Sequence, residues 1–166
     1  MADFDSSSRV AGTGFYYIEG DLALLNAALI NYARDVMVSK GFRYVETPLM
    51  LKEEVIDNVT DLDAKENQIF LMRNFPLALI GTSEQSIGVM HAGEIFDEKD
   101  LPKRYVGFST CFRREAGSYG KDTKGILRVH QFDKVEMFSF CRPEDSTKEH
   151  ELLLSLEEKL MRQLKL

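Results

Sequence analysis

The residues best suited to chemistry lie between positions 106 and 136, where the sequence predicts two strands joined by a long loop. Strand alternation gathers one set of polar side chains on a single face of this pair. From the first arm these are Gly107, Ser109, Cys111, Arg113 and Glu115, and from the returning arm they are Arg128, His130, Phe132, Lys134 and Glu136. Guanidinium groups pair with phosphate oxygens, carboxylates accept from amines, and an aromatic ring stacks on a purine. The pattern therefore indicates a nucleotide and amine site, or else the solvated face of an ordinary hairpin.

The identity of these residues favours the site. The run Phe112-Arg113-Arg114-Glu115, a loop rich in glycine and lysine, and the run from Arg128 to Glu136 closely resemble motif 2 of the class II aminoacyl-tRNA synthetases, in the form found in seryl-tRNA synthetases. This likeness covers residues 101–145 almost without a break. Residues 81–84, Gly-Thr-Ser-Glu, are similar to the Thr-x-Glu loop of the same family. Residues 10–17 and 41–48 resemble the segment that carries motif 1, so the resemblance covers nearly the whole chain.

The resemblance implies a role for each matching residue. Arg113 matches the arginine that bridges the α-phosphate of ATP and the amino-acid carboxylate, and it is the expected catalytic residue. The other expected ATP-binding residues are Glu115 at the adenine amino group, Arg128 at a phosphate, Val129 through its main chain, and Phe132 as the ring on which adenine stacks. The expected serine-binding residues are Thr82, Glu84 and Glu136.

Thr82 and two neighbours of the expected site residues, His130 and Arg114, also have simpler interpretations. Thr82, followed three residues later by Gln85, fits a capping box that opens a helix without any ligand. His130 fits a satisfied histidine within a strand, and Arg114 falls on the opposite, apolar-alternating face. No metal-binding residues are expected, because the histidines and the two cysteines, Cys111 and Cys141, lack ligand spacing and the cysteines fit buried free thiols.

The family resemblance also implies cofactors and partners. These are ATP with Mg²⁺, L-serine, and serine tRNA in the full-length protein, for which a loop that includes Gly117 and Gly120 reaches the acceptor end. A homodimer is expected through the helix that starts at Asp21 and the strand that reaches Pro48. The same segments are explained equally well as core scaffold.

Charge and hydropathy agree with a protein that binds nucleotide locally. The chain of 166 residues carries a formal charge of −6, yet residues 103–134 hold eight basic and three acidic side chains, a local charge of +5. Such a balance disfavours a surface that grips nucleic acid everywhere. The sequence has neither an apolar run long enough for a membrane span nor a signal-like leader. We therefore expect a soluble, cytoplasmic protein with no membrane association.

The expected fold class is α+β, a partial class II synthetase core with a mainly antiparallel sheet flanked by helices. We expect one domain, residues 1–166, in five parts: a polar leader at 1–14, the motif 1 region at 15–51, a hairpin and the Thr-x-Glu loop at 69–91, the strand-loop-strand at 103–142, and a helix at 143–166. The leader turns into a strand at residues 15–18. Between residues 52 and 68 one short helical patch is expected.

The chain departs from the family in what it lacks. Neither an N-terminal coiled-coil arm nor a motif 3 sequence is present, and the last helix shows no stop signal. We therefore expect a truncated catalytic core with reduced or no activity. The main alternative is a non-catalytic, synthetase-like module for dimerisation or regulatory binding. A carboxylate-activating amide synthetase fits less well, since it would share Arg113 but not the surroundings of Thr82 and His130.

Overall fold

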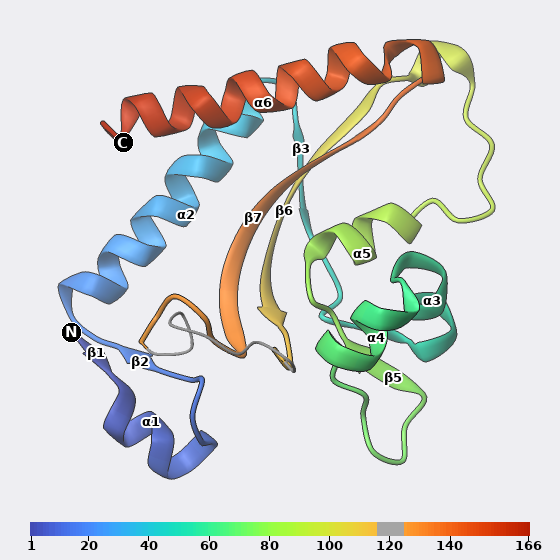
Figure 1. The fold of residues 1–166 in the computed structure, drawn as a ribbon. Helices are drawn as coiled ribbons and strands as arrows, with labels where there is room; N and C mark the ends of the chain where they lie inside the picture. Colours follow the sequence, from blue (N-terminus) through green and yellow to red (C-terminus); the bar gives the residue numbers. More distant parts are fainter. Residues whose placement is uncertain (116–124) are drawn as a thin grey trace.

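The computed structural model describes residues 1–115 and 125–166, without the side chains of residues 62–64. The strands are β1 (Ala2–Asp3), β2 (Tyr17–Ile18), β3 (Arg43–Glu46), β4 (Met50–Lys52), β5 (Leu77–Leu79), β6 (Lys103–Phe112) and β7 (Gln131–Phe140). The helices are α1 (Phe4–Ala11), α2 (Asp21–Ser39), α3 (Glu53–Val59), α4 (Leu62–Gln68), α5 (Ser83–Val89) and α6 (Ser146–Gln163), with single 3₁₀ turns at Glu98–Asp100 and Pro143–Asp145. This arrangement confirms the expected α+β class (Figure 1).

The long pair β6 and β7 forms the centre of the molecule. The two strands are antiparallel over their whole length, from Lys103 opposite Phe140 to Phe112 opposite Gln131. Strand β3 adds to the other edge of β6 in parallel, which gives the order β3-β6-β7. The returning strand was expected to include Arg128 and His130. It begins only at Gln131, so both residues precede it.

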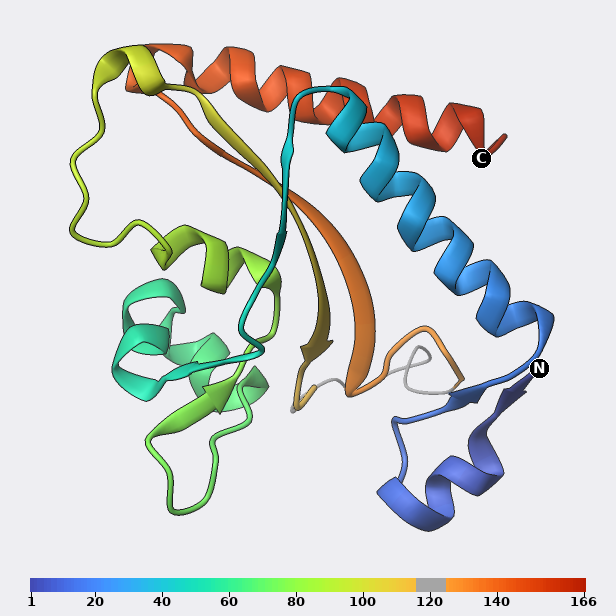
Figure 2. The ribbon, with the colours of Figure 1, turned by 180° about the vertical axis from the view of Figure 1, so that it is seen from behind.

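Helices α2 and α6 cover one face of this sheet (Figure 2). Their core contains Met37 from α2, Val106 from β6 and Leu156 from α6, all nearly inaccessible to water. Burial of each such side chain stabilises the fold by about 1.5–3 kcal/mol. The expected helix at 21–40 is confirmed, although Gly20 is its N-cap and Asp21 its first helical residue. The carboxylate of Asp21 still favours the positive end of the helix dipole.

The opposite face of the sheet carries α5, and α3 packs against α5 in turn. Close approach of α5 is possible because Gly107 has no side chain: a Cβ there would lie 2.7 Å from Ile87 Cδ1. A second small core of Ile56, Ile69 and Ala78 lies beneath α3 and α4. Two helices therefore replace the one helical patch expected at 52–68.

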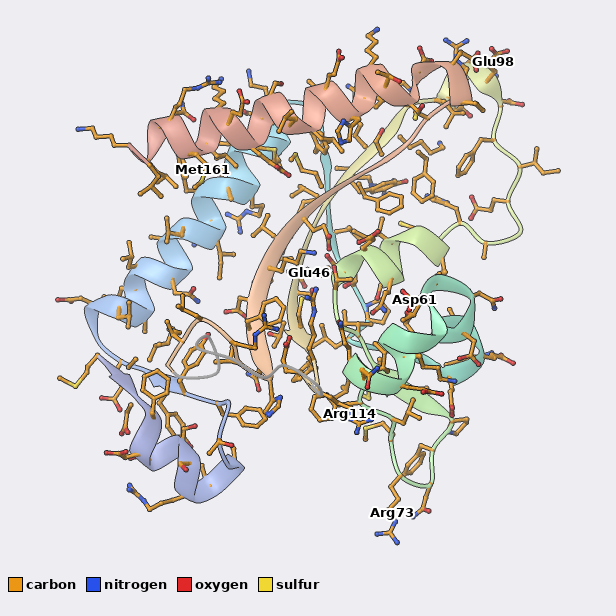
Figure 3. All side chains as sticks on the ribbon, in the orientation of Figure 1. Glu46, Asp61, Arg73, Glu98, Arg114 and Met161 are labelled. Carbon is orange, nitrogen blue, oxygen red and sulfur yellow. The ribbon has the colours of Figure 1, made fainter. Side chains whose placement is uncertain are left out.

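The hairpin expected at the start of residues 69–91 forms in part, because the Met72 amide donates to the Leu77 carbonyl and the Leu79 amide donates to the Phe70 carbonyl, both at 2.9 Å. Its first arm is shorter than expected, because residues up to Gln68 are helical and the arm makes a single bridge, between Leu71 and Ala78. The main partner of β5 is β4, from a segment far earlier in the chain. The turn that joins Leu71 to β5 projects from the molecule, with Arg73 at its tip (Figure 3).

Residues 1–14, expected as a polar leader, contain a strand and a helix that were not predicted. Strand β1 pairs with β2, and α1 follows with Asp3 as its N-cap, whose side chain accepts a hydrogen bond from the Ser6 amide at 2.9 Å. The chain then turns through Gly12 and Gly14, both with positive φ. Among the described residues, no helix combines the length and the apolar character needed to cross a membrane.

Candidate active site

The polar face of β6 and β7 lies where the alternation predicted it. The register sets Cys111 opposite Phe132, Ser109 opposite Lys134 and Gly107 opposite Glu136. All of these side chains share the face that meets α5. The sheet thus aligns an aromatic ring, a cation and a carboxylate at two-residue intervals along β7.

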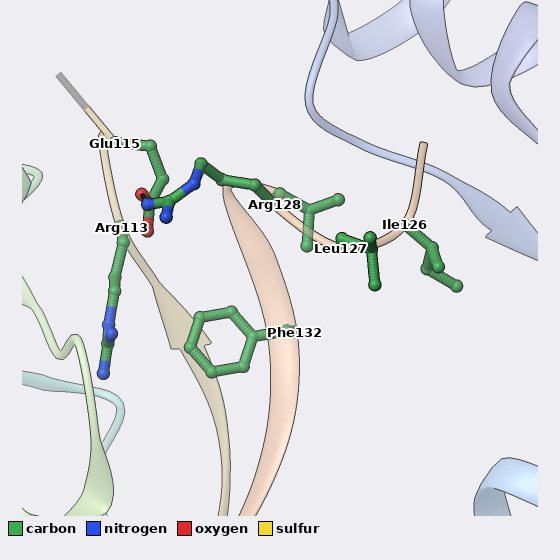
Figure 4. Close-up of a pocket in the computed structure, with 7 residues that line it drawn as sticks. Arg113, Glu115, Ile126, Leu127, Arg128 and Phe132 are labelled. Carbon is green, nitrogen blue, oxygen red and sulfur yellow. Dashed lines mark hydrogen bonds and ion pairs between the residues drawn. The ribbon is translucent and has the colours of Figure 1, made fainter. Parts of the chain in front are cut away.

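A cavity of about 410 Å³ opens at the end of this strand pair. Its lining contains every residue expected at the nucleotide together with two apolar neighbours: Arg113, Glu115, Ile126, Leu127, Arg128, Val129 and Phe132. Figure 4 shows the ring of Phe132 beside Arg113, with the side chains of Glu115 and Arg128 next to each other. The structure therefore brings together the five residues of the expected ATP site.

The guanidinium group of Arg113 makes two contacts. Its Nε donates to the carbonyl oxygen of Gly81 at 3.2 Å, and its guanidinium carbon lies 5.2 Å from the centre of the Phe132 ring. A cation over an aromatic face is attracted by the ring quadrupole. The guanidinium is therefore fixed between the start of α5 and the strand, where it faces the cavity.

Glu115 and Arg128, which both line the cavity, form an ion pair at 2.5 Å. Glu115 has a φ of +50°, a backbone conformation uncommon for a residue with a side chain. Its carboxylate is largely buried and the Arg128 side chain is 42% exposed. An anion and a cation thus lie side by side in the cavity lining.

A second polar cluster surrounds Glu136, further along β7. Its Oε2 accepts from the hydroxyl of Thr82, from the hydroxyl of Ser83 at 3.1 Å and from the amide of Glu84 at 3.0 Å. Its Oε1 accepts from Lys134 Nζ at 2.5 Å. Lys134 also donates to Thr82 Oγ1 at 3.0 Å, which closes the network.

This network controls the charge of the carboxylate. Burial raises the pKa of the Glu136 carboxyl, but the hydrogen bonds from Lys134 and Thr82 lower that pKa by more, so the group stays ionised. Burial raises the pKa of the nearby Cys111 thiol, which keeps it protonated and unreactive. The site thus presents a fixed carboxylate and no activated nucleophile at these positions.

Thr82 and Glu136, both expected at the amino acid, are in direct contact. Glu84 takes part through its main-chain amide, while its side chain is exposed. The structure confirms Thr82 as the N-cap of α5, because its hydroxyl accepts from the Glu84 amide at 3.3 Å, but the Gln85 side chain does not close the expected capping box. Gln85 accepts from the Gly81 amide at 2.8 Å, so the same short segment both starts α5 and supports the site.

Sequence reasoning gave no role to Lys134 or Ser83. Alternation had placed Lys134 on the correct face, between Phe132 and Glu136, and that spacing was the available signal. Ser83 is fully buried and contacts Glu136, yet nothing in the local sequence separates it from an ordinary first-turn serine.

The remaining expectations have mixed outcomes. Arg114 leaves the site: its amide and guanidinium donate to the carbonyls of Gln68 and Glu66, at 2.8 and 2.9 Å (Figure 3). Cys111 is buried as expected, whereas Cys141 is only half-buried and follows β7. The loop glycines Gly117 and Gly120 lie outside the described residues. Within residues 1–115 and 125–166, no group of three or more His, Cys, Asp or Glu side chains is placed to hold a metal ion.

Comparison with known proteins gives these contacts a context. Residues 71–166 match the family model described as the tRNA synthetase class II core domain (G, H, P, S and T). The chain is 48% identical over 163 residues to a serine–tRNA ligase of Methanocella arvoryzae, across 98% of its own length and 38% of that protein. The chain therefore spans well under half the length of the curated relatives it matches.

Solved structures agree with these sequence matches. A seryl-tRNA synthetase from Pyrococcus horikoshii, complexed with ATP, superposes with a TM-score of 0.95 at 45% identity, over 98% of this chain and 36% of that one. A cytoplasmic serine–tRNA ligase from Naegleria fowleri, in complex with AMP, gives a TM-score of 0.91 at 37% identity, over 95% of this chain and 38% of that one.

Proposed function

Because this chain belongs to the tRNA synthetase class II core family, we propose that it carries the ATP- and serine-binding part of a serine–tRNA ligase. One observation supports this most directly. The same sheet face joins an arginine-lined cavity of about 410 Å³ to a partly buried carboxylate network four residues along β7. Adenosine phosphates need the first of these, and the ammonium group of an amino acid needs the second.

The proposed reaction is in-line displacement at the α-phosphorus of ATP. A carboxylate oxygen of serine forms the new bond to phosphorus, the bond from that phosphorus to the oxygen bridging to the β-phosphate breaks, and pyrophosphate leaves. No side-chain nucleophile is required, which suits a site whose thiol is kept protonated. Positioning and charge neutralisation supply the rate enhancement.

Arg113 has the central role in this proposal. Fixed by Gly81 and Phe132, its guanidinium is oriented before substrate arrives, so little reorganisation is needed when the carboxylate and the α-phosphate meet. Phe132 offers the stacking surface for adenine and Glu115 accepts from its amino group. Arg128 neutralises a phosphate, and we propose that Val129, which also lines the cavity, contacts the nucleotide through its main chain.

Mg²⁺ is proposed to enter with ATP. The described residues do not form a ready metal cluster, and Glu115 is the acidic side chain of the cavity lining. Magnesium commonly keeps several waters and binds through one or two carboxylates and substrate phosphates, so such a lining fits an ion carried by the nucleotide. When bound, the ion would supply neutralisation of phosphate charge.

The Glu136 network is proposed to recognise the amino acid. Thr82 and Glu136 present oxygens to the ammonium group, and Glu84 completes the wall through its amide. A substrate lacking a hydroxyl would leave buried polar groups unpaired, which is the physical basis for rejecting alanine.

Transfer of serine to its tRNA is proposed for the whole protein, since this chain spans about 38% of its relatives. We propose a homodimer through α2 and β3, supported by the exposed apolar side chains of Leu24, Leu25 and Leu29 on α2. A cytoplasmic location is proposed by likeness to the Naegleria fowleri enzyme, named as cytoplasmic. Sedimentation showing a monomer at tens of micromolar would remove the dimer from this proposal.

Pyrophosphate exchange tests the activity. With ATP and Mg²⁺ present, serine should stimulate exchange of label between pyrophosphate and ATP, and alanine and lysine should not. Equal stimulation by alanine would defeat the serine assignment. Nucleotide binding without exchange by any amino acid would instead favour a non-catalytic binding module.

A further inference from the structure

His130 lies just before β7 and connects Arg113 to the N-terminal part of the chain. The Arg113 amide donates to the His130 carbonyl at 2.9 Å, and the His130 amide donates to the Gly14 carbonyl at 2.7 Å. The imidazole Nδ1 lies 2.9 Å from the carbonyl oxygen of Arg113. The backbone of Arg113 is therefore bound on both its polar groups by one residue.

The direction of the side-chain bond follows from chemistry. A carbonyl oxygen only accepts, so Nδ1 of His130 must carry the proton. The neutral ring with hydrogen on Nδ1 and the imidazolium both meet this condition. The contact is therefore kept whether or not the ring is charged, and it acts as a fixed support.

Packing leaves the ring of His130 little freedom. Phe15 lies 5.4 Å from it at an interplanar angle of 51°, and Phe70 lies 6.0 Å away at 82°. On a third side stands Gly14, where a Cβ would lie 2.5 Å from His130 Cδ2 and 2.9 Å from Nε2. Only glycine at position 14 admits the ring in this place.

We propose that His130 is a positioning residue for Arg113, and that Gly14 and Phe15 fix its ring so that Nδ1 meets the Arg113 carbonyl. This inference rests on the proposed ATP site, because Arg113 is the residue that is positioned. It extends that proposal to the N-terminal segment, which supports the arginine from 99 positions earlier in the sequence. Neither Gly14 nor His130 lines the cavity itself.

Two amide substitutions at His130 distinguish the effect of its hydrogen bond to the Arg113 carbonyl from the effect of losing the ring. The side-chain nitrogen of asparagine reaches about the place of Nδ1, whereas that of glutamine reaches about the place of Nε2. His130→Asn should retain ATP affinity within about threefold, and His130→Gln should lose about tenfold, which corresponds to one lost hydrogen bond. Both variants remove the ring, so their melting temperatures should fall by similar amounts. Equal ATP affinities in the two variants would overturn the proposal.

Two glycines provide an independent comparison. Gly12 and Gly14 both have positive φ, +90° and +84°, so alanine strains the backbone at either position, but a Cβ at Gly12 meets nothing within 4 Å. Gly14→Ala should therefore weaken ATP binding about tenfold while Gly12→Ala leaves it within about twofold. Similar affinities for the two variants would count against positioning through the ring.

Other measurements distinguish a failure of the proposed ATP site from a failure of the His130 inference. If the wild-type chain does not bind ATP, or Arg113→Ala binds as tightly as wild type, the proposed function fails. Hydrogen exchange at the Arg113 amide, followed by NMR without nucleotide, then decides the inference alone. Exchange should quicken at least about tenfold in His130→Gln and Gly14→Ala relative to His130→Asn and Gly12→Ala. Equal protection in all four variants would refute it.

Discussion

Lys134 Nζ lies 2.5 Å from Glu136 Oε1, two residues further along the same face of β7. The lysine side chain is 33% exposed and the glutamate 14%, so this pair is only partly shielded from water. The two hydroxyls and the amide at the start of α5 occupy the other carboxylate oxygen. The strand thus supplies both a carboxylate and the cation that keeps it ionised.

Replacing Lys134 with methionine should destabilise the fold and shift its acid response. The native pKa of Glu136 lies below 4.5, so its contribution is present above pH 4.5 and lost as the pH falls through the native pKa. Without Lys134 the burial effect has less opposition, the pKa rises, and the loss should begin at higher pH. At pH 7 we expect a cost of about 1–3 kcal/mol in urea unfolding. Lys99→Met removes an exposed pair with Asp97 and should leave both measurements unchanged.

Arg113→Ala should abolish most ATP binding. The lost charge-assisted contact to phosphate is worth about 1.5–3 kcal/mol, or roughly ten- to a hundredfold in affinity. Titration calorimetry with ATP and Mg²⁺ measures this change. Arg73→Ala, at the tip of the projecting turn, removes the same charge far from the cavity and is the matched control. Equal losses in both variants would mean that net charge, and not the site, governs binding.

Thr82→Val should reduce serine-dependent exchange more than ATP affinity. Valine keeps the shape of threonine but neither donates to Glu136 nor accepts from Lys134. Loss of the helix cap adds a stability cost of about 0.5–2 kcal/mol, so exchange is measured well below the melting temperature. Thr82→Ser retains the hydroxyl and should keep most activity. If the serine variant is as impaired as the valine variant, the hydroxyl is not what the amino acid requires.

Glu149→Gln should weaken the fold without touching the site. Glu149 is 6% exposed, pairs with Arg104 and accepts from Ser139 at 2.8 Å, which ties α6 to the sheet. The Arg104 guanidinium lowers the pKa of Glu149, so this support is present above pH 4.5 and disappears as the pH falls through the native value. Leaving Arg104 without its anion should cost about 3 kcal/mol in chemical unfolding. Glu158→Gln, in an exposed pair with Arg162, should change stability by less than about 0.5 kcal/mol.

The features that could be predicted from the sequence are those with a local periodic pattern. Alternation within a strand depends only on the strand itself, so the shared face of Phe132, Lys134 and Glu136 could be predicted, as could the long helix from Asp21. The pairing of β4 with β5 depends on contacts distant in sequence and was not predicted, whereas the expected hairpin supplies only a short second partner for β5. Helix α1 was not predicted, because three consecutive serines lie within it and Asp3 was not recognised as its N-cap.

The sequence predicted which residues form the site better than it predicted the contacts between them. Arg113 and Phe132 were placed through their resemblance to a known motif, and they line one cavity. The support from His130 was not predicted, because it depends on a glycine that reaches the ring from the N-terminal segment. Lys134 went without a role because its contact with Thr82 spans 52 positions.

The unbroken ladder of β6 and β7 also acts as a ruler between the two halves of the site. Phe132 and Glu136 are four residues apart on one strand, a span of about 13 Å at the rise of a β-strand. Because side chains alternate with a period of two, inserting or deleting a single residue between them would turn one of the two towards α2 and α6. Insertions or deletions between Phe132 and Glu136 therefore keep both side chains on one face only if they change the length by two residues. Each such change would also alter the distance that a molecule contacting both side chains has to span.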